Sequence, residues 1–305
     1  MNRRNFLLAL PAAATAAAPA WQLRQEPGQA QVHRGGQLFA TLHIGSEWDK
    51  PFLDPLRAAD GTDLSRGWPV AKRQGDTEDH AWHRGLWWGH GVINGEDYWR
   101  EIKEKTGFIR TSRVSGRRVG DVFRIAAKHT LRTRANQTVA GLNTAWTLAE
   151  SSNERTIDFA MTLRATQELR FGDTDDGGFG FRLREEFRED RGAKLTNAEG
   201  KTGAKKIWGR PSAWTHYEAL VDGKPYGAAI LSHPGNLRHP AGWHARNYGL
   251  NSANPFAASS FAEEKGGTRG EYLLAAKATL RLRYRVILHS GSCDIAARYQ
   301  QWTRS

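Results

Sequence analysis

The sequence predicts a mainly β fold, a large two-sheet β-sandwich that ends in a short C-terminal helix. Apolar and polar residues alternate with a period of two over several segments, which is typical of half-buried strands. Helical periodicity is scarce, and the connections are rich in Gly and Pro. No repeat of fixed period is visible, which argues against a propeller or a solenoid. With 39% hydrophobic and 25% charged residues among 305, the chain can bury a sizeable core.

The strands follow from this alternation in chain order. Residues 31–34 and 37–44 flank Gly35-Gly36 and predict a hairpin. Further strands are predicted over four segments, 119–133, 139–150, 156–164 and 279–289. One face of the last strand is solvated or lines a polar groove, because it carries Arg281, Arg283, Arg285 and His289. Near the C-terminus Ser292 is placed to cap a short amphipathic helix that contains Ile295, Tyr299 and Trp302.

The N-terminus has the three parts of an export signal. Arg3 and Arg4 are followed by an Ala- and Leu-rich stretch over 8–18 and by small residues at 18–20. A membrane-spanning helix needs about 20 apolar residues, and this stretch is about half as long. We therefore expect a twin-arginine signal peptide over 1–20, export to the periplasm or beyond the cell, no membrane insertion, and a single β-sandwich domain over 21–305.

Charge and cysteine content narrow the class of partner. The formal net charge is +12, and removal of the signal with its two arginines leaves +10. The basic residues are scattered, with no run of five like charges, so we expect no nucleic-acid partner and either a solvated basic surface or an acidic glycan. Cys293 is the only cysteine, which excludes a disulfide framework and a Cys-based zinc site. Twelve tryptophans are consistent with sugar stacking, although core packing alone could use most of them.

Three segments concentrate polar, aromatic and glycine residues beyond what strands need, namely 76–99, 171–182 and 233–256. The first predicts a sugar site with a His general acid or base, or a His-based metal site, and the alternative is hydrogen-bonded histidines beneath a Trp-rich core. The second either presents carboxylates to a ligand or forms a long hairpin turn. In the third, Arg246 could clamp a carboxylate, and the alternative is an ordered loop that satisfies its own backbone.

Several motifs in fixed order resemble those of the DUF6807 family. They are Arg66-Gly67-Trp68-Pro69, His80-x-x-His83-Arg84-Gly85-Leu86-Trp87, Gly89-His90-Gly91 with Asn94-Gly95, Gly172-Asp173-Thr174, and Trp243-His244-x-Arg246-x-Tyr248-Gly249-Leu250 through Asn254-Pro255-Phe256. Ala81 stands where relatives usually have Pro. The resemblance implies an exported bacterial protein of carbohydrate metabolism with a galactose mutarotase-like sandwich, and it transfers no catalytic residue. The family's methane-oxygenase (PmoA) label conflicts with the absence of a predicted spanning helix.

The leading functional hypothesis is a carbohydrate-active enzyme, a lyase, epimerase or hydrolase that uses His-based acid/base chemistry. The candidate catalytic residues are His83, His90, Arg84, Asp97 and Arg246. The candidate substrate-binding residues are His80, Trp87, Trp88, Asn94, Asp173, Trp243, His244, Tyr248 and Asn251. Of these, Trp87, Trp88 and Trp243 are expected to line the pocket.

Two other hypotheses use the same residues. A non-catalytic periplasmic glycan-binding protein would need the tryptophans and arginines but no histidine in position for proton transfer. A metal-dependent oxidoreductase would need a divalent cation, for which the candidate ligands are His80, His83 and His90, although their spacing matches no standard metal motif. No cofactor follows from the sequence otherwise.

Overall fold

The computed structural model describes residues 20–264 and 266–304. The predicted signal peptide over 1–20 lies outside these residues except for Ala20, so its export role remains a prediction. Within the described ranges, no helix is long and apolar enough to cross a membrane.

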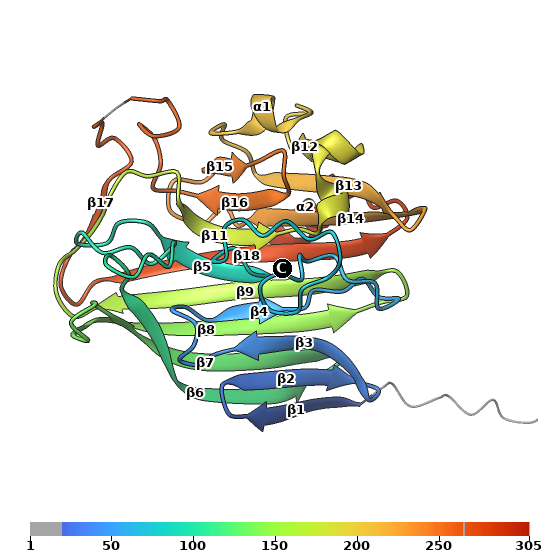
Figure 1. Ribbon diagram of the computed structural model, residues 1–305, viewed down its shortest axis with the longest axis horizontal. Helices are drawn as coiled ribbons and strands as arrows, with labels where there is room; N and C mark the ends of the chain where they lie inside the picture. The colour runs from blue at the N-terminus through green and yellow to red at the C-terminus, as the bar shows by residue number, and fades with distance from the viewer. Residues whose placement is uncertain (1–19, 265, 305) are drawn as a thin grey trace, which may run out of the picture.

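Two large antiparallel sheets form the two layers of the fold (Figure 1). In the first sheet the strands lie in the order β1 (Trp21–Glu26), β2 (Gln29–Arg34), β3 (Gln37–His43), β4 (Phe52–Asp54), β5 (Leu86–His90), β11 (Gly177–Arg182), β16 (Leu250–Asn254) and β15 (Gly242–Ala245). The β2–β3 hairpin turns at Gly35-Gly36, as predicted. The sequence neighbours β5 and β6 lie in different sheets, and β11 joins β5 to β16.

The second sheet contains the long strands that the alternation predicts. Its order is β12 (Lys194–Asn197), β13 (Trp214–Val221), β14 (Lys224–Ser232), β18 (Thr279–Ser290), β9 (Glu154–Ala165), β8 (Thr138–Glu150), β7 (Val122–Arg132) and β6 (Phe108–Val119). A separate pair, β10 (Leu169–Phe171) with β17 (Tyr272–Leu274), closes one end. The two-sheet β-sandwich is therefore confirmed.

The apolar residues of each long strand point between the sheets. In β9, Ile157, Phe159, Met161 and Leu163 are buried, and in β18 Leu280, Leu282, Tyr284 and Val286 are buried. These side chains join the first sheet in one continuous core through stacked rings, among them Phe159 on Phe179 and Phe179 on Tyr284. Burial of apolar surface at this scale is the main free energy that holds two sheets together.

Helices are short and lie outside the sandwich. They are the 3₁₀ turns Glu185–Phe187 and Glu189–Arg191, α1 (Ala204–Ile207) and α2 (Ile295–Thr303). The predicted C-terminal helix is present, but the capping residue was wrong: Asp294, not Ser292, accepts the N–H of Ala297 at 2.9 Å. A carboxylate stabilises a helix N-terminus better than a hydroxyl two positions outside it. Ile295 and Trp302 pack on Ala229, Leu231 and Ile287, so α2 covers part of the outer face of the second sheet.

Two glycines of β11 let the neighbouring strand β16 and the ring of Trp87 approach its backbone closely. Gly178 has φ of +91°, and a Cβ there would lie 1.9 Å from the carbonyl oxygen of Ala253. A Cβ on Gly180 would lie 2.7 Å from the indole of Trp87. The backbone of β11 is thus approached closely on both sides, which only glycine permits.

Candidate functional site

A pocket of about 360 Å³ lies over the outer face of the first sheet, where four connecting segments meet. It is lined by His80, Trp82 and His83 from the segment before β5, Arg100 and Ile102 from the segment after β5, Asp175 and Asp176 from the β10–β11 connection, and His244, Arg246 and Tyr248 from β15 and the turn after it. The volume is at the lower end of the range for small-molecule sites. Five predicted site residues converge here: His80, His83, His244, Arg246 and Tyr248.

The segment that carries His80 and His83 is folded around one buried cation. The guanidinium of Arg66 donates to the carbonyl oxygens of Thr77, Asp79, His80 and His83 at 2.8–3.1 Å, and to the carboxylate of Asp79 at 2.5 Å. A chain that follows no regular structure must satisfy its carbonyls in some other way, and Arg66 satisfies four of them. This contact holds the histidine segment in place without a strand or helix.

Four aromatic rings form a column along one side of the pocket. Tyr248 stacks on His80 with ring centroids 5.7 Å apart, His80 on His83 at 5.0 Å, and His83 on Trp87 at 5.2 Å. Trp99 donates its indole N–H to Nε2 of His83 at 3.1 Å, so neutral His83 carries its proton on Nδ1. That Nδ1 is buried and has no hydrogen-bond partner in the described ranges. Burial and the nearby Arg182 hold the pKa of His83 well below 6.5.

His244 is the histidine whose free nitrogen is best placed for chemistry. Its Nδ1 lies 2.8 Å from the carbonyl oxygen of Asp175, to which it must donate, so Nε2 carries the lone pair. Burial lowers the pKa of His244 to about 4, although Asp175 works in the opposite direction. The ring is therefore neutral at neutral pH. Its Nε2 lies 3.9 Å from the Asp175 carboxylate, at the wall of the pocket.

Two adjacent carboxylates face two arginines across the pocket. Burial and the neighbouring Asp175 raise the pKa of Asp176 to about 6. Arg100 lies 3.4 Å from the Asp176 carboxylate, and Arg246 lines the same space. Asp176 Oδ1 is also 4.0 Å from Nδ1 of His244. The pocket therefore combines a neutral imidazole, a carboxyl group that titrates near neutrality, and two fixed cations.

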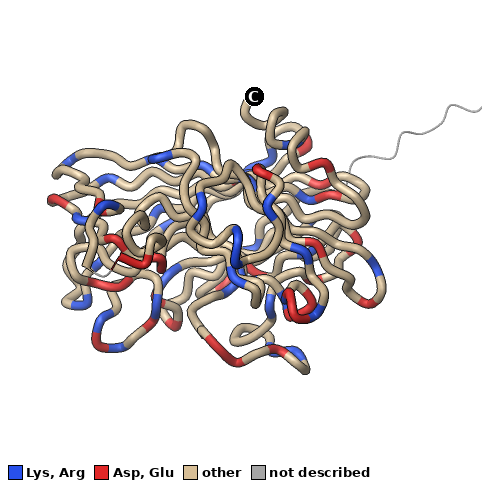
Figure 2. The backbone as a smooth tube through the Cα atoms, turned by 90° about the horizontal axis from the view of Figure 1, so that it is seen from above, with Lys and Arg blue, Asp and Glu red and all other residues tan. Residues whose placement is uncertain are grey.

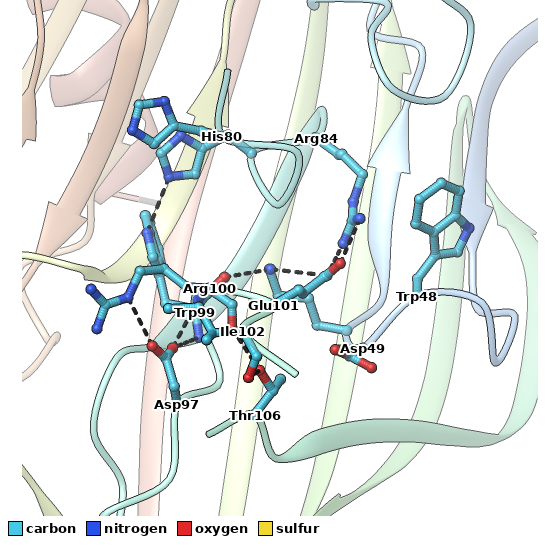
Figure 3. A network of polar contacts seen from close by, with 12 residues as sticks. Trp48, Asp49, His80, Arg84, Asp97, Trp99, Arg100, Glu101, Ile102 and Thr106 are labelled. Atoms are coloured by element: carbon cyan, nitrogen blue, oxygen red, sulfur yellow. Dashed lines mark hydrogen bonds and ion pairs between the residues drawn. The ribbon is translucent and has the colours of Figure 1, made fainter. Parts of the chain in front are cut away.

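A second polar network fixes the segment after β5, which carries Arg100 and Ile102 (Figure 3). The Asp97 carboxylate accepts the backbone N–H groups of Trp99 and Arg100 and the Arg100 Nε, each at 2.8 Å. Glu101 pairs with Arg84, and the Arg84 guanidinium lies over the rings of Trp48 and Phe52. The predicted catalytic residues Arg84 and Asp97 therefore lie outside the pocket lining, where their charges are used to position this segment.

Four other predicted site residues lie in packed interior positions. His90 donates its Nε2–H to the carbonyl oxygen of Gly172 at 2.8 Å and packs on Phe171 and Phe256. Trp243 is fully buried and donates to the carbonyl of Ser212, and Trp88 belongs to the core between the sheets. The expectation that Trp87, Trp88 and Trp243 line the pocket was wrong, because all three are at most 4% exposed. Tyr248 and Trp82 supply the aromatic surface of the pocket instead.

Of the remaining predicted residues, Asn94 and Asp173 support loops and Asn251 lies in the interior. Asn94, at φ of +53°, bonds the backbone of Glu168 and Arg170. Asn251 accepts the hydroxyl of Thr215 at 2.8 Å, in the interior. Asp173 accepts the backbone N–H groups of Ser259, Ser260 and Gly270 at 2.7–3.0 Å. These bonds make Asp173 the anchor of the segment between β16 and β17, away from the pocket lining.

Replacement of Asp173 by Asn is expected to destabilise the fold by about 1–3 kcal/mol, because an amide accepts fewer of these N–H groups and carries no charge. The chain around Ser259, Ser260 and Gly270 should also become more sensitive to proteolysis. Chemical denaturation and limited digestion measure both effects. Asp222→Asn is the matched control, since Asp222 is exposed in a turn at φ of +51°, where Asn is well tolerated. Equal effects of the two substitutions would contradict the anchoring role.

The three histidines predicted as candidate metal ligands do not come together in the structure. The rings of His80 and His83 stack face to face, and His90 bonds Gly172, so the three do not converge. No group of three or more His, Cys, Asp or Glu side chains that could hold a metal ion occurs in 20–264 and 266–304.

The sequence analysis singled out 171–182 as a segment that could present carboxylates to a ligand, but it named Asp173 rather than Asp176 as the site residue, and it missed Arg100. The sequence did contain evidence for Asp176. Two consecutive carboxylates in a glycine-rich turn repel each other, which is unfavourable unless a cation or a ligand faces them. The signal for Arg100 was absent, since its position depends on the Asp97 turn. Arg182 was also missed; it is fully buried beneath Tyr248, with its guanidinium carbon 4.5 Å from the ring centroid.

Comparison with solved structures finds distant matches over most of the chain. A galactose mutarotase-like protein from Lactobacillus casei is 10% identical, with a TM-score of 0.41, over 88% of this chain and 100% of that one. A galactose mutarotase-like protein from Clostridium acetobutylicum is 8% identical, with a TM-score of 0.38, over 90% of this chain and 99% of that one. A galactose mutarotase related enzyme from Lactobacillus acidophilus is 8% identical, with a TM-score of 0.37, over 90% of this chain and 98% of that one. These descriptions belong to those proteins.

Among curated proteins none matches the chain. A family model matches residues 29–303, which is nearly all of the described sandwich and includes every residue that lines the pocket. The chain therefore belongs to DUF6807, a family of unknown function.

Proposed function

We propose that the protein is a carbohydrate-active enzyme that moves protons at a sugar by acid/base catalysis, in an elimination or an epimerisation. One observation carries the proposal: the free Nε2 of His244 and the Asp176 carboxyl open into one pocket beside Arg100 and Arg246. A base, an acid and fixed cations at one small cavity are the parts that such a proton transfer requires.

His244 acts as the base in this proposal. Its Nδ1–H is held by the Asp175 carbonyl, so the tautomer and ring orientation are fixed before substrate binds. The imidazolium that forms is stabilised by the nearby Asp175 carboxylate, 3.9 Å from Nε2. Burial keeps the ring neutral and able to accept a proton at all pH values above about 4.

Asp176 acts as the acid. With a pKa of about 6, it is protonated in a large fraction of molecules in mildly acidic solution, unlike an ordinary Asp. The cations Arg100 and Arg246 would bind a sugar carboxylate and stabilise the charge that develops when a proton beside it is removed. Tyr248 and Trp82 offer ring faces and edges against which a sugar can pack.

The proposal is tested with a panel of uronic acids, oligouronates and neutral sugars incubated in D₂O and followed by proton NMR. We expect deuterium incorporation at a carbon-bound position, a new epimer or an unsaturated product for at least one acidic sugar, at a rate that follows enzyme concentration. Binding by titration calorimetry with no conversion of any member would overturn the enzyme and favour a glycan-binding protein. Neither binding nor conversion would overturn both.

A further inference from the structure

A second cavity, of about 440 Å³, is an open trough on the outer face of the second sheet, away from the pocket described above. It lies over β6, β7, β8 and β9, the half of this sheet that α2 leaves uncovered. We propose that this trough binds an acidic polysaccharide, held by a field of unpaired cations. The binding surface is separate from the pocket and does not depend on its chemistry.

The strand register defines the trough as three rows that run across the strands. The floor is the row Arg283, Ala160, Ala145, Ala126 and Ser115. One bank is the row Arg281, Thr162, Asn143, Lys128 and Arg113. The other bank is the row Arg285, Asp158, Thr147, Arg124 and Arg117. Neighbouring rows are about 7 Å apart and each row spans about 19 Å, from the usual rise and strand spacing.

The charges on the two banks are not balanced by protein. The rows contain one acid, Asp158, and its carboxylate pairs with Arg285 at 2.5 and 2.7 Å. Arg113, Arg124 and Lys128 line the trough and are exposed, and no acid in the described ranges forms an ion pair with them. Figure 2 shows Lys and Arg spread around the molecule, so basic residues alone do not distinguish the trough; within its three rows, Asp158 is the one acid.

The pairing of these cations has an energetic cost that an anion would relieve. Arg113 lies directly opposite Lys128, and Arg117 directly opposite Arg124, on the antiparallel strands β6 and β7. Like charges directly opposite one another destabilise a sheet. Two such pairs lie at the same edge of the sheet, with no acid between them. This arrangement is expected where a bound anionic ligand supplies the neutralising charge.

The other side chains of the rows identify the ligand as a polyanion rich in hydroxyl groups. Thr162, Asn143, Thr147 and Ser115 can donate and accept hydrogen bonds beside the cations. The floor of alanines lets a chain lie close to the sheet. The three rows contain no aromatic ring, on which single-stranded nucleic acid would stack, and no large apolar group that would enter a membrane.

The test compares retention in affinity gels that contain dextran sulfate, polygalacturonate or neutral dextran, at several salt concentrations. We expect strong retention by the two polyanions, none by dextran, and a loss of affinity with salt. Arg124→Glu/Lys128→Glu should weaken binding to the polyanions at least tenfold and lower the salt dependence. The same substitutions create opposite-charge pairs with Arg117 and Arg113, so the thermal midpoint should not fall.

The matched control is Lys201→Glu/Lys206→Glu, which changes the net charge equally at exposed positions by α1 and should weaken binding less than twofold. Equal losses in both variants would overturn the proposal in favour of a nonspecific effect of net charge. Tighter binding to duplex DNA than to either polysaccharide through Arg124 and Lys128 would overturn it in favour of nucleic acid. A His244→Asn variant should keep full retention, so that failure of the trough and failure of the pocket chemistry give different results.

Discussion

His244→Asn is expected to reduce turnover of the converted sugar by about 10²–10⁴-fold, the usual contribution of a positioned general base. The Asn amide can still donate to the Asp175 carbonyl as Nδ1 does, so the segment keeps its hydrogen bond. What is lost is the lone pair of Nε2. Steady-state kinetics should therefore show the loss in kcat, with KM changed by less than about threefold.

His90→Gln serves as the control for this substitution. His90 is equally buried and also bonds a backbone carbonyl, but it packs between Phe171 and Phe256 away from the pocket. Gln reproduces the reach of Nε2, so turnover of the folded variant should stay within about threefold of wild type. A large loss of kcat in His90→Gln together with a normal His244→Asn would reverse the assignment and restore the base that the sequence alone suggested.

The pH profile of kcat provides a second, independent readout of the same pair. The His244 base must be neutral, so the rate should rise as pH passes about 4, and the Asp176 acid must be protonated, so the rate should fall as pH passes about 6. The optimum therefore lies near pH 5. In Asp176→Asn the fall above pH 6 should disappear along with most of the activity. A profile that is flat from pH 4 to 8 in wild type would contradict both roles.

Four strands of the second sheet were predictable because each is long and has one face in the core. Alternation over 11 to 13 residues in β7, β8, β9 and β18 leaves no ambiguity about which residues are inside. Apart from the β2–β3 hairpin, most short strands of the first sheet were not predicted, because strands such as β5 and β16 are buried on both faces and show no alternation. Loops cover their outer face, and only the folded chain shows this.

The sequence predicted which segments form the site, but not which of their side chains face the pocket. The segments with His80, His83, His244 and Arg246 stood out by composition, and they meet at one pocket. Other polar residues of the same segments, such as His90 and Asp97, do not line the pocket. His90 and Asp97 lie within 14 residues of His83, yet one packs among phenylalanines and the other caps a turn. Outside regular structure, direction is decided by individual hydrogen bonds, such as those of Arg66, and no periodicity encodes them.

Glu101→Gln is expected to cost about 3–5 kcal/mol of unfolding free energy, because it leaves two buried cations without their partner. Arg84 and Lys50 are each 2% exposed, and Glu101 pairs with both. Burial alone would raise the pKa of Glu101, but Lys50 and Arg84 outweigh it and hold the pKa below 4.5. Without the carboxylate, Lys50, whose pKa burial already lowers to about 8, can release its proton, but Arg84 cannot.

Glu104→Gln separates this effect from a general loss of charge in the same segment. Glu104 is exposed three residues later, and its substitution should change stability by less than about 0.5 kcal/mol. The pH dependence gives the sign check: since the folded pKa of Glu101 is depressed, its contribution is present above about pH 4.5 and is lost as pH falls through the lower folded value. The gap between wild type and Glu101→Gln in urea denaturation should therefore be largest at neutral pH and narrow in acid. A gap independent of pH would mean that packing of the side chain, rather than its charge, holds Arg100 and Ile102 at the wall of the pocket.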